Sequence, residues 1–175
     1  MNQKYILTGA PGTGKTSIIL ELKRRGYCCI EENSREIISD QMQKKGEILP
    51  WKNQIAFENK IAQIRMQKYI NSPKNEICFF DRSIIDSIAY LKFNNLDITS
   101  QIIDNVKNSH FNKTVFLTPI WEEIYINDNE RKENIKQAIQ IGAAIIKAYH
   151  SRGYKLLEIP KISVKERSDF IIANI

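Results

Sequence analysis

The sequence contains no long apolar run. Its apolar stretches, such as Ile18–Leu20 and Ile77–Phe80, are short, whereas a helix needs about 20 consecutive apolar residues to span a bilayer. We therefore expect no membrane span. The first residues lead directly into an apolar segment that we interpret as a strand of the fold, so we also expect no cleaved signal peptide and a cytoplasmic protein.

Cysteine and histidine are scarce, with three cysteines and two histidines in 175 residues. Cys28, Cys29 and Cys78 show no CxxC spacing, and His110 and His150 stand alone, so the pattern excludes the common zinc sites. The cysteines fall in segments that we interpret as strands, where a thiol packs as a small hydrophobic group in a reducing compartment. A chain of this length buries roughly 70% of its unfolded surface and needs no disulfide.

Basic residues are in excess, and the formal net charge is +6. The densest basic clusters, Lys23–Arg25 and Lys44–Lys45, have no interleaved aromatic residues, so we do not favour a nucleic acid as substrate. A basic surface around a phosphate-handling site accounts for the charge equally well. The length fits one domain that covers residues 1–175, and the sequence does not decide whether the protein forms a homodimer.

Short apolar segments alternate with longer amphipathic ones, which is typical of strands and helices in an α/β protein. A Ser-x-x-Glu pattern from Ser163 to Glu166 predicts a capping box at the start of the last helix. The expected strands are 5–8, 27–31, 76–80, 114–117 and 155–159, and the expected helices are 17–25, 35–45, 53–70, 84–93, 100–109, 133–150 and one that begins at 163.

A phosphate-binding motif begins at Gly9. The eight residues GAPGTGKT match G-x-x-x-x-G-K-[ST] at every fixed position, between an expected strand and an expected helix. Backbone N–H groups and the positive helix end would hold the phosphates of ATP or GTP, with ATP as our default. We expect Lys15 to reach the β- and γ-phosphates and the Thr16 hydroxyl to bind Mg²⁺. The expected nucleotide-binding residues are Gly9, Ala10, Pro11, Gly12, Thr13, Gly14, Lys15, Thr16 and Ser17.

This motif in this context predicts a three-layer α/β P-loop NTPase fold. We expect a five-stranded parallel sheet in the order 2-3-1-4-5, in the manner of nucleoside and nucleotide kinases. In this order the strand that ends near Asp81 lies directly beside the strand that leads into the phosphate loop. A strand inserted between these two would indicate the other large class of P-loop proteins.

The third expected strand ends in Asp81-Arg82-Ser83. An acid at this place in P-loop proteins holds Mg²⁺, so Asp81 is the second expected metal residue; a helix N-cap is the alternative, but Ser83 can serve that role. AAA-type ATPases usually carry a second carboxylate after this Asp, where this chain has Arg82. The Asp-Arg-Ser end resembles nucleoside and nucleotide kinases, which implies that Arg82 contacts the acceptor or its phosphates.

The second expected strand leads into Glu31 and Glu32, at the edge of the sheet that faces an acceptor. A carboxylate there can accept the proton of an attacking hydroxyl, and we place Glu32 ahead of Glu31 in this role. Glu32 and Arg35 would share one helical face if the following helix starts early, and both are expected to bind substrate together with Arg82. The alternative for Glu32 is an acid that only stabilises a helix start.

A lid is expected between the fourth strand and the helix at 133–150. We expect Arg131, rather than Lys132, to stabilise charge on the transferred phosphoryl group, although residues 127–132 also fit an ordinary solvated loop. Trp51 directly follows Pro50, and Trp121 follows Pro119 by two residues; both are in expected loops, where each fits an acceptor pocket or simple packing. The expected catalytic residues are Lys15, Glu32, Asp81, Arg82 and Arg131.

Nearly the whole chain resembles a small AAA-domain P-loop family. The similar segments are GAPGTGKT (9–16), ENSREII (32–38), LPW (49–51), FDR (80–82), DSIAY (86–90), WEEIY (121–125) and DNER (128–131). The resemblance implies an ATPase or kinase of NAD metabolism, related to the ribosylnicotinamide kinase domain and to the P-loop module of TRPL-translocation-defect-type proteins.

From these patterns we predict a kinase that transfers the γ-phosphoryl group of ATP to a small nucleoside-like or nucleotide acceptor. Its expected partners are a nucleoside triphosphate with Mg²⁺ and a small-molecule acceptor. The alternatives are a slow NTPase and a nucleotide-binding regulatory switch that acts on a protein partner. The acceptor itself cannot be identified from any residue of the sequence.

Overall fold

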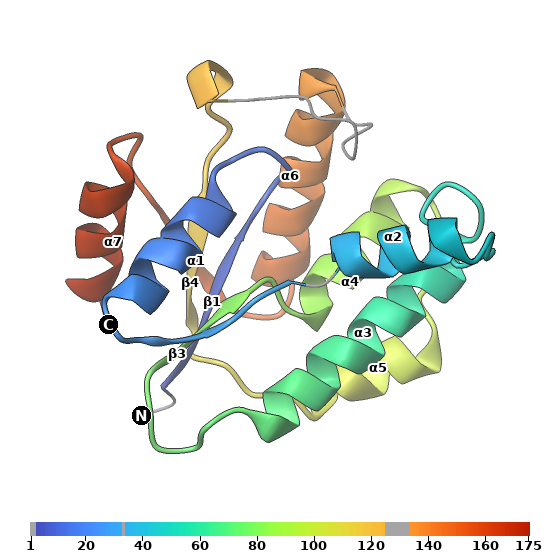
Figure 1. Ribbon diagram of the computed structural model, residues 1–175, viewed down its shortest axis with the longest axis horizontal. Helices are drawn as coiled ribbons and strands as arrows, with labels where there is room; N and C mark the ends of the chain where they lie inside the picture. Colours follow the sequence, from blue (N-terminus) through green and yellow to red (C-terminus); the bar gives the residue numbers. More distant parts are fainter. Residues whose placement is uncertain (1–2, 33, 125–133) are drawn as a thin grey trace.

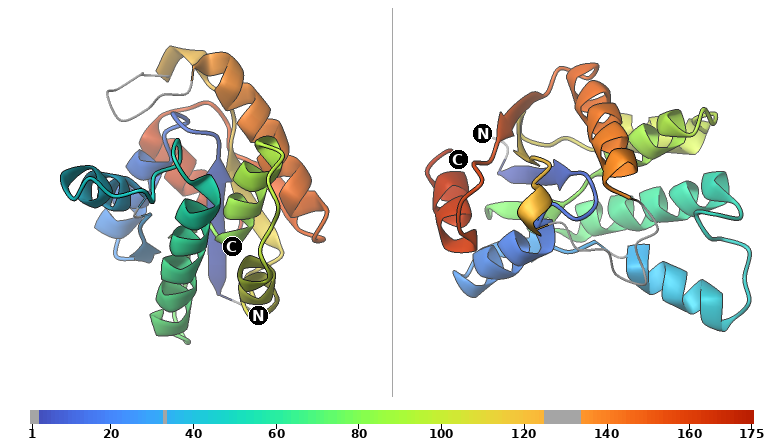
Figure 2. Two further views of the ribbon diagram at one scale, coloured as in Figure 1. Left: turned by 90° about the vertical axis from the view of Figure 1, so that its right-hand side faces the viewer. Right: turned by 90° about the horizontal axis from the view of Figure 1, so that it is seen from above.

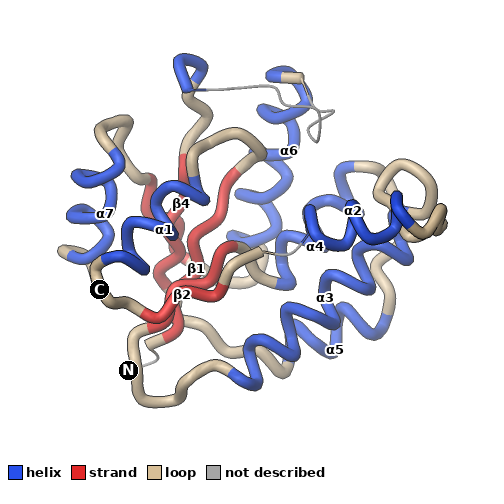
Figure 3. Tube along the Cα trace, viewed as in Figure 1, coloured by secondary structure: helices blue, strands red, loops and turns tan. Residues whose placement is uncertain are grey.

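A computed structural model describes residues 3–32, 34–124 and 134–175. Within these residues five strands form one parallel sheet in the order β2-β3-β1-β4-β5 (Figures 1 and 3), which confirms the predicted order. The register pairs Leu7 with Asp81 and Gly9 with Thr118. The strands are β1 (Lys4–Gly9), β2 (Cys28–Ile30), β3 (Cys78–Asp81), β4 (Thr114–Thr118) and β5 (Lys155–Glu158).

Helices cover both faces of this sheet. The helices α1 and α7 pack on one face, α4 and α6 pack on the other, and α3 and α5 form a further layer against α4 (Figures 1 and 2). The three-layer arrangement is therefore as predicted. The helices are α1 (Lys15–Arg24), α2 (Ser34–Gln43), α3 (Gln54–Asn71), α4 (Ile84–Phe93), α5 (Ser100–Lys107), the 3-10 turn η1 (Glu122–Ile124), α6 (Ile135–His150) and α7 (Val164–Ile172).

Alternating side chains of the strands supply the core on the two faces. Ile6 and Phe80 point to the α4 and α6 side, whereas Leu7 and Phe79 point to the α1 and α7 side. Such alternation follows from the two-residue period of a strand. The cysteines lie in β2 and β3 as expected: Cys78 is buried, and the two others are partly buried against the core.

Local signals set most helix starts. Ser83 caps α4 and Ser163 caps α7, each in a reciprocal capping box with the acid three residues later, as the Ser-x-x-Glu pattern at 163 predicted. The helix α2 begins at Ser34, one residue before its expected start, so Glu32 precedes it and the condition for a helical face shared with Arg35 is not met. Among the described residues, no helix is both long and apolar enough to cross a bilayer.

The parallel strands place the candidate site at one edge of the sheet. The carboxyl ends of β1, β2 and β3 are adjacent there, because β3 lies between the other two strands. Gly9 ends β1, Asp81 ends β3, and Glu32 follows the end of β2 by two residues. Ligands of open α/β sheets bind in the crevice outside this edge.

Candidate functional site

The phosphate loop connects β1 to α1 and depends on glycines at two close contacts. Gly9 has φ 147°. A Cβ there would lie 2.2 Å from Thr118 Oγ1 and 2.5 Å from the Thr118 carbonyl oxygen. Gly14 has φ 81°, and a Cβ there would lie 2.9 Å from Arg167 Nη1. No side chain fits either position without movement, so the glycines let the loop lie against β4 on one side and against α7 on the other.

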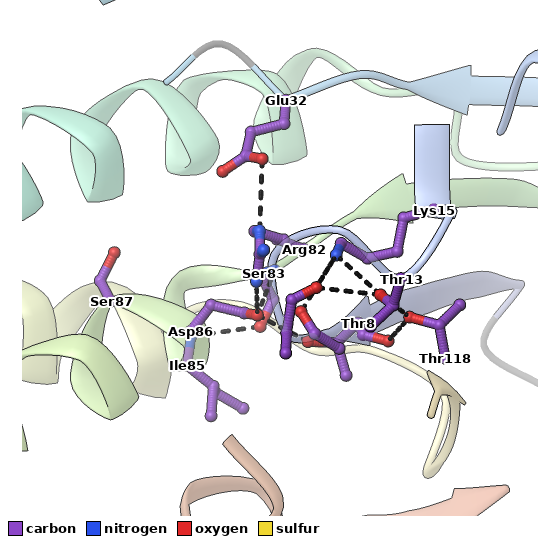
Figure 4. Close-up of polar contacts among 12 residues, drawn as sticks. Thr8, Thr13, Lys15, Glu32, Arg82, Ser83, Ile85, Asp86, Ser87 and Thr118 are labelled. Carbon is purple, nitrogen blue, oxygen red and sulfur yellow. Dashed lines mark hydrogen bonds and ion pairs between the residues drawn. The ribbon is translucent and has the colours of Figure 1, made fainter. Parts of the chain in front are cut away.

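Lys15 lies within this loop and is 7% exposed. Its Nζ donates to the carbonyl oxygens of Gly9 at 3.0 Å and Ala10 at 2.7 Å, and to Thr13 Oγ1 at 3.4 Å (Figure 4). Burial, and then the nearby positive charge of Arg82, lower the pKa of Lys15 to about 7. An anion that enters the loop would therefore meet a desolvated ammonium group whose charge it stabilises.

Asp81 ends β3 and is 8% exposed. Its Oδ1 is buried and accepts no hydrogen bond from the described part of the chain. Burial, and then the negative charge of Glu32, raise the pKa of Asp81 to about 6. Asp81 and Thr16 line the same cleft. An orphaned carboxylate oxygen in the same cleft as a hydroxyl suits Mg²⁺, which prefers oxygen ligands and keeps several of its waters.

Arg82 adopts a strained conformation directly after Asp81. Its φ is 69°, in the left-handed region that non-glycine residues seldom adopt. The guanidinium is 5% exposed and donates from Nε to Glu32 Oε2 at 3.2 Å and from Nη1 to Asp86 Oδ1 at 3.0 Å (Figure 4). It also lies 5.6 Å from the ring centroid of Tyr90. Strain of this kind persists only where surrounding contacts hold the residue in place.

Asp86 holds the guanidinium of Arg82 in place. It is fully buried and accepts hydrogen bonds from Thr8 Oγ1 at 2.6 Å, Tyr149 Oη at 2.5 Å and the Ser83 backbone at 2.9 Å. Burial alone would raise its pKa, but Arg82 and Arg65 hold the pKa of Asp86 below its ordinary value. The network ties β1, α4 and α6 together behind the guanidinium of Arg82.

Glu32 is held between two arginines. Arg65 of α3 donates from Nη2 to Glu32 Oε1 at 2.8 Å, while Arg82 binds the other carboxylate oxygen. Burial opposes ionisation, but Arg82 and Arg65 keep the pKa of Glu32 below its ordinary value, so it is a carboxylate at neutral pH. Glu31 points elsewhere: its side chain is 49% exposed and pairs with Lys23 at 2.7 Å.

These side chains surround one cleft of ≈ 340 Å³. Pro11, Gly12, Lys15 and Thr16 of the phosphate loop line one end, and Glu32, Asp81 and Arg82 also line it. Residues of α3 and α4 and of the segment before α3 line the same cleft, and we call this part of it the second end. The residues that line this second end are Trp51, Gln54, Phe57, Glu58, Ile61, Arg65, Tyr90, Phe93 and Asn94.

Of the other residues that the sequence singles out, some line the cleft and some do not. Arg35 is an exposed residue that lines the cleft, as does Trp51. Trp121 is not part of the lining; its ring lies 5.4 Å from the guanidinium of Arg167, behind the phosphate loop. Ser17 is exposed on the first turn of α1. Arg131 and the expected lid fall outside the described residues.

Sequence reasoning missed three residues of the site: Glu58, Arg65 and Asp86. Asp86 left a signal, because it stands three residues after Ser83 in a capping-box pattern. Glu58 and Arg65 left none, because both are polar residues within a long amphipathic stretch, and only the packing of α3 turns them toward the cleft. The partner of Arg65 at the site, Glu32, is remote in sequence.

Comparisons with known proteins give a family and a fold. A family model described as an AAA domain matches residues 4–167. No curated protein sequence matches significantly. Deoxyadenosine kinase from M. mycoides, in a structure with dCMP and dCDP, is similar with a TM-score of 0.71 and 18% identity, over 98% of this chain and 97% of that chain.

Two further solved structures are similar. The NadR protein in complex with NR has a TM-score of 0.75 and 16% identity, over 98% of this chain and 51% of that chain, so this chain spans about half of it. Thymidylate kinase from Ehrlichia chaffeensis has a TM-score of 0.67 and 12% identity, over 98% and 97% of the two chains. At these identities the similarity shows the fold alone, which is that of nucleoside and nucleotide kinases.

Proposed function

Because the chain belongs to the AAA domain family and has a P-loop kinase fold, we propose that it is a kinase. In this proposal it transfers the γ-phosphoryl group of ATP to a hydroxyl of a small nucleoside-like or nucleotide acceptor. One observation carries the proposal: the cleft lined by the phosphate loop is also lined by aromatic residues of α3 and α4 and by Trp51, which leaves it larger than water requires. Hydrolysis alone would need room for water only.

The geometry suggests a role for each group. The loop and Lys15 would bind the β- and γ-phosphates, where the positive charge opposes the charge that develops on transfer. Thr16 and Asp81 would hold Mg²⁺, which when bound neutralises phosphate charge. The acceptor oxygen would attack the γ-phosphorus as the bond to the β–γ bridging oxygen breaks, and its proton would pass to the carboxylate of Glu32.

The two arginines proposed to bind substrate, Arg82 and Arg35, would act mainly by holding the acceptor or the triphosphate in place. Arg82 is fixed by Asp86 and by Glu32, so its guanidinium is available at the cleft without a cost for ordering it on binding. Arg35 is exposed at the rim, where it suits an acceptor phosphate or the triphosphate. The lid residue Arg131 remains a proposal from the sequence.

The first test is a nucleoside screen. Purified protein with Mg²⁺ and γ-labelled ATP is incubated with single nucleosides, nucleoside monophosphates and nicotinamide riboside, and labelled products are separated. We expect one class of acceptor to gain label at a rate well above ATP hydrolysis. Label released only as inorganic phosphate, at the same rate with and without every acceptor, would instead support the slow NTPase.

The metal site gives a second prediction. Asp81→Asn removes the negative charge from the carboxylate whose Oδ1 has no hydrogen-bond partner among the described residues. The Mg²⁺ concentration that gives half-maximal rates of transfer and of background hydrolysis should therefore rise by about tenfold or more. A Mg²⁺ titration of both rates measures the effect. Asp104→Asn is the matched control. Asp104 is an exposed residue of α5 that pairs with Lys107 at the surface. Equal Mg²⁺ curves for Asp81→Asn and wild type would contradict the metal assignment.

A further inference from the structure

Glu58 is a buried carboxylate that the reaction above does not use. It lies on α3, is 4% exposed, and lines the second end of the cleft. Burying an ionisable carboxyl costs free energy, so such groups are seldom present for packing alone. The groups that act on its pKa, after burial itself, are Arg65, the Ser87 hydroxyl, Glu32 and Arg82.

The spacing along α3 relates Glu58 to the reacting end of the cleft. Arg65 lies two turns further along the same helix and holds Glu32. At 1.5 Å per residue, Glu58 and Arg65 are separated by about 10 Å along the helix axis. This spacing is that of the backbone positions, and both side chains line the same cleft, so an acceptor whose hydroxyl reaches Glu32 can place its ring beside Glu58. The helices α3 and α4 pack against each other (Figures 1 and 2), and residues of both line this end of the cleft.

The residues around Glu58 suit a flat ring. Trp51, Phe57, Tyr90 and Phe93 line the same end of the cleft. Aromatic side chains stack on planar heterocycles, and a carboxylate within such a surface accepts hydrogen bonds but cannot donate them when ionised. It therefore favours a ring edge with N–H donors and opposes one with carbonyl oxygens.

On the basis of the proposed function, we infer that Glu58 is the specificity residue for the acceptor ring. It accepts a hydrogen bond from an amino or carboxamide N–H of the ring. The acceptor class is then a nucleoside with such a group, in preference to one that presents carbonyl oxygens, as uridine does. Cytidine and uridine have the same sugar and differ at this edge: cytidine has a 4-amino group beside an N3 acceptor, whereas uridine has a 4-carbonyl beside an N3–H, and they are a pair of probes.

Titration behaviour adds support to the geometry. Burial raises the pKa of Glu58 from 4.5 to about 7, although Arg65 and the Ser87 hydroxyl act in the opposite direction. The folded protein therefore holds this proton more tightly than the unfolded chain does, and stability is lost as the pH rises from about 4.5 through 7. A side chain that lowers stability at neutral pH is more readily explained by ligand recognition than by packing.

The test compares Glu58→Gln with wild type by calorimetric titration at pH 8, with Mg²⁺ and a non-hydrolysable ATP analogue. The probes are cytidine, adenosine, nicotinamide riboside and uridine. Wild type should bind at least one amino or carboxamide probe about 10- to 100-fold more tightly than uridine, as expected for a charge-assisted hydrogen bond. Glu58→Gln should bring that ratio close to one, because an amide can also donate to a carbonyl. Affinity for the ATP analogue should stay unchanged.

A stability measurement separates recognition from packing. Glu58→Gln should raise the Tm at pH 8 and raise it less at pH 5, where the wild-type carboxyl is largely protonated in the folded state. A side chain needed only for its contacts within the protein would give a lower Tm at both pH values when replaced. Glu76→Gln, at an exposed position before β3, is the matched control.

Three results would overturn the inference. The first is equal binding of cytidine and uridine by wild type, with no preference among the other probes. The second is a preference that is unchanged in Glu58→Gln, and the third is no binding of any amino or carboxamide probe. The proposed kinase function fails separately. If the binding preference holds but no probe accepts labelled phosphate, then ring recognition stands and transfer does not. If an acceptor is phosphorylated equally well by Glu58→Gln, then transfer stands and the role of Glu58 does not.

Discussion

Glu32→Gln is expected to slow phosphoryl transfer by about 10²- to 10⁴-fold while the affinity for ATP stays unchanged, because general-base catalysis typically contributes this much. The wild-type carboxylate is held by Arg65 and Arg82, which keep its pKa low and leave it ionised. Glutamine keeps the shape of the side chain but cannot take a proton from the acceptor hydroxyl. The loss should therefore appear in kcat.

The neighbouring residue offers a matched comparison. Glu31→Gln makes the same chemical change one residue away, on a side chain that is 49% exposed and paired with Lys23, so transfer should be near the wild-type rate. Glu32→Asp keeps the charge that the two arginines need but withdraws it by one methylene group. That variant should stay folded and still lose most of the transfer rate.

A structural role for Glu32 predicts a different pattern. If the carboxylate only holds Arg65 and Arg82, then Glu32→Gln should lower the free energy of unfolding and raise the acceptor KM, and kcat should remain near wild type. Single-turnover rates at saturating acceptor, together with thermal unfolding, distinguish the two. A normal kcat in Glu32→Gln with a proven acceptor would end the assignment of Glu32 as the base.

The sheet could be predicted from the sequence because its signals are local. The GAPGTGKT segment fixes which strand and helix flank the phosphate loop, and short apolar segments mark the other strands. Ser83 and Ser163 mark helix starts through side-chain bonds to residues within one turn. Such features depend on a few consecutive residues, so a pattern of residue types is sufficient to find them.

The site was predictable only where it follows the ends of the strands. Asp81 and Arg82 were expected at the edge because they close an apolar strand. The clamp on Glu32 was not, because Arg65 reaches it from a helix whose rotation is set by packing of Ala62 against α4. The start of α2 was predicted to within one residue, whereas the position of Glu32 between Arg65 and Arg82 was not, because both arginines are remote from it in sequence.

Lys15→Ala is expected to weaken binding of ATP by about 100-fold or more. In the described structure the Lys15 ammonium bonds to the carbonyl oxygens of Gly9 and Ala10 and reaches Thr13, so it already lies inside the loop where phosphates would bind. Contacts to both the β- and γ-phosphates are two charge-assisted hydrogen bonds, each worth about 1.5–3 kcal/mol. Their loss amounts to about 3 kcal/mol or more, which is about 100-fold in Kd.

Comparing nucleotides and variants shows whether the weaker ATP binding of Lys15→Ala comes from lost phosphate contacts. Lys15→Ala should weaken ATP and ADP strongly and AMP little, since AMP has no β- or γ-phosphate. Lys15→Met keeps most of the buried stem and should give the same pattern with a smaller change in Tm, which separates loss of charge from loss of packing. Lys23→Ala, on the exposed side of α1, removes a lysine that pairs with Glu31 and should leave every Kd near wild type. An unchanged Kd for ATP in folded Lys15→Met would mean that the phosphates bind elsewhere, and the proposed orientation of the acceptor along α3 would fail with it.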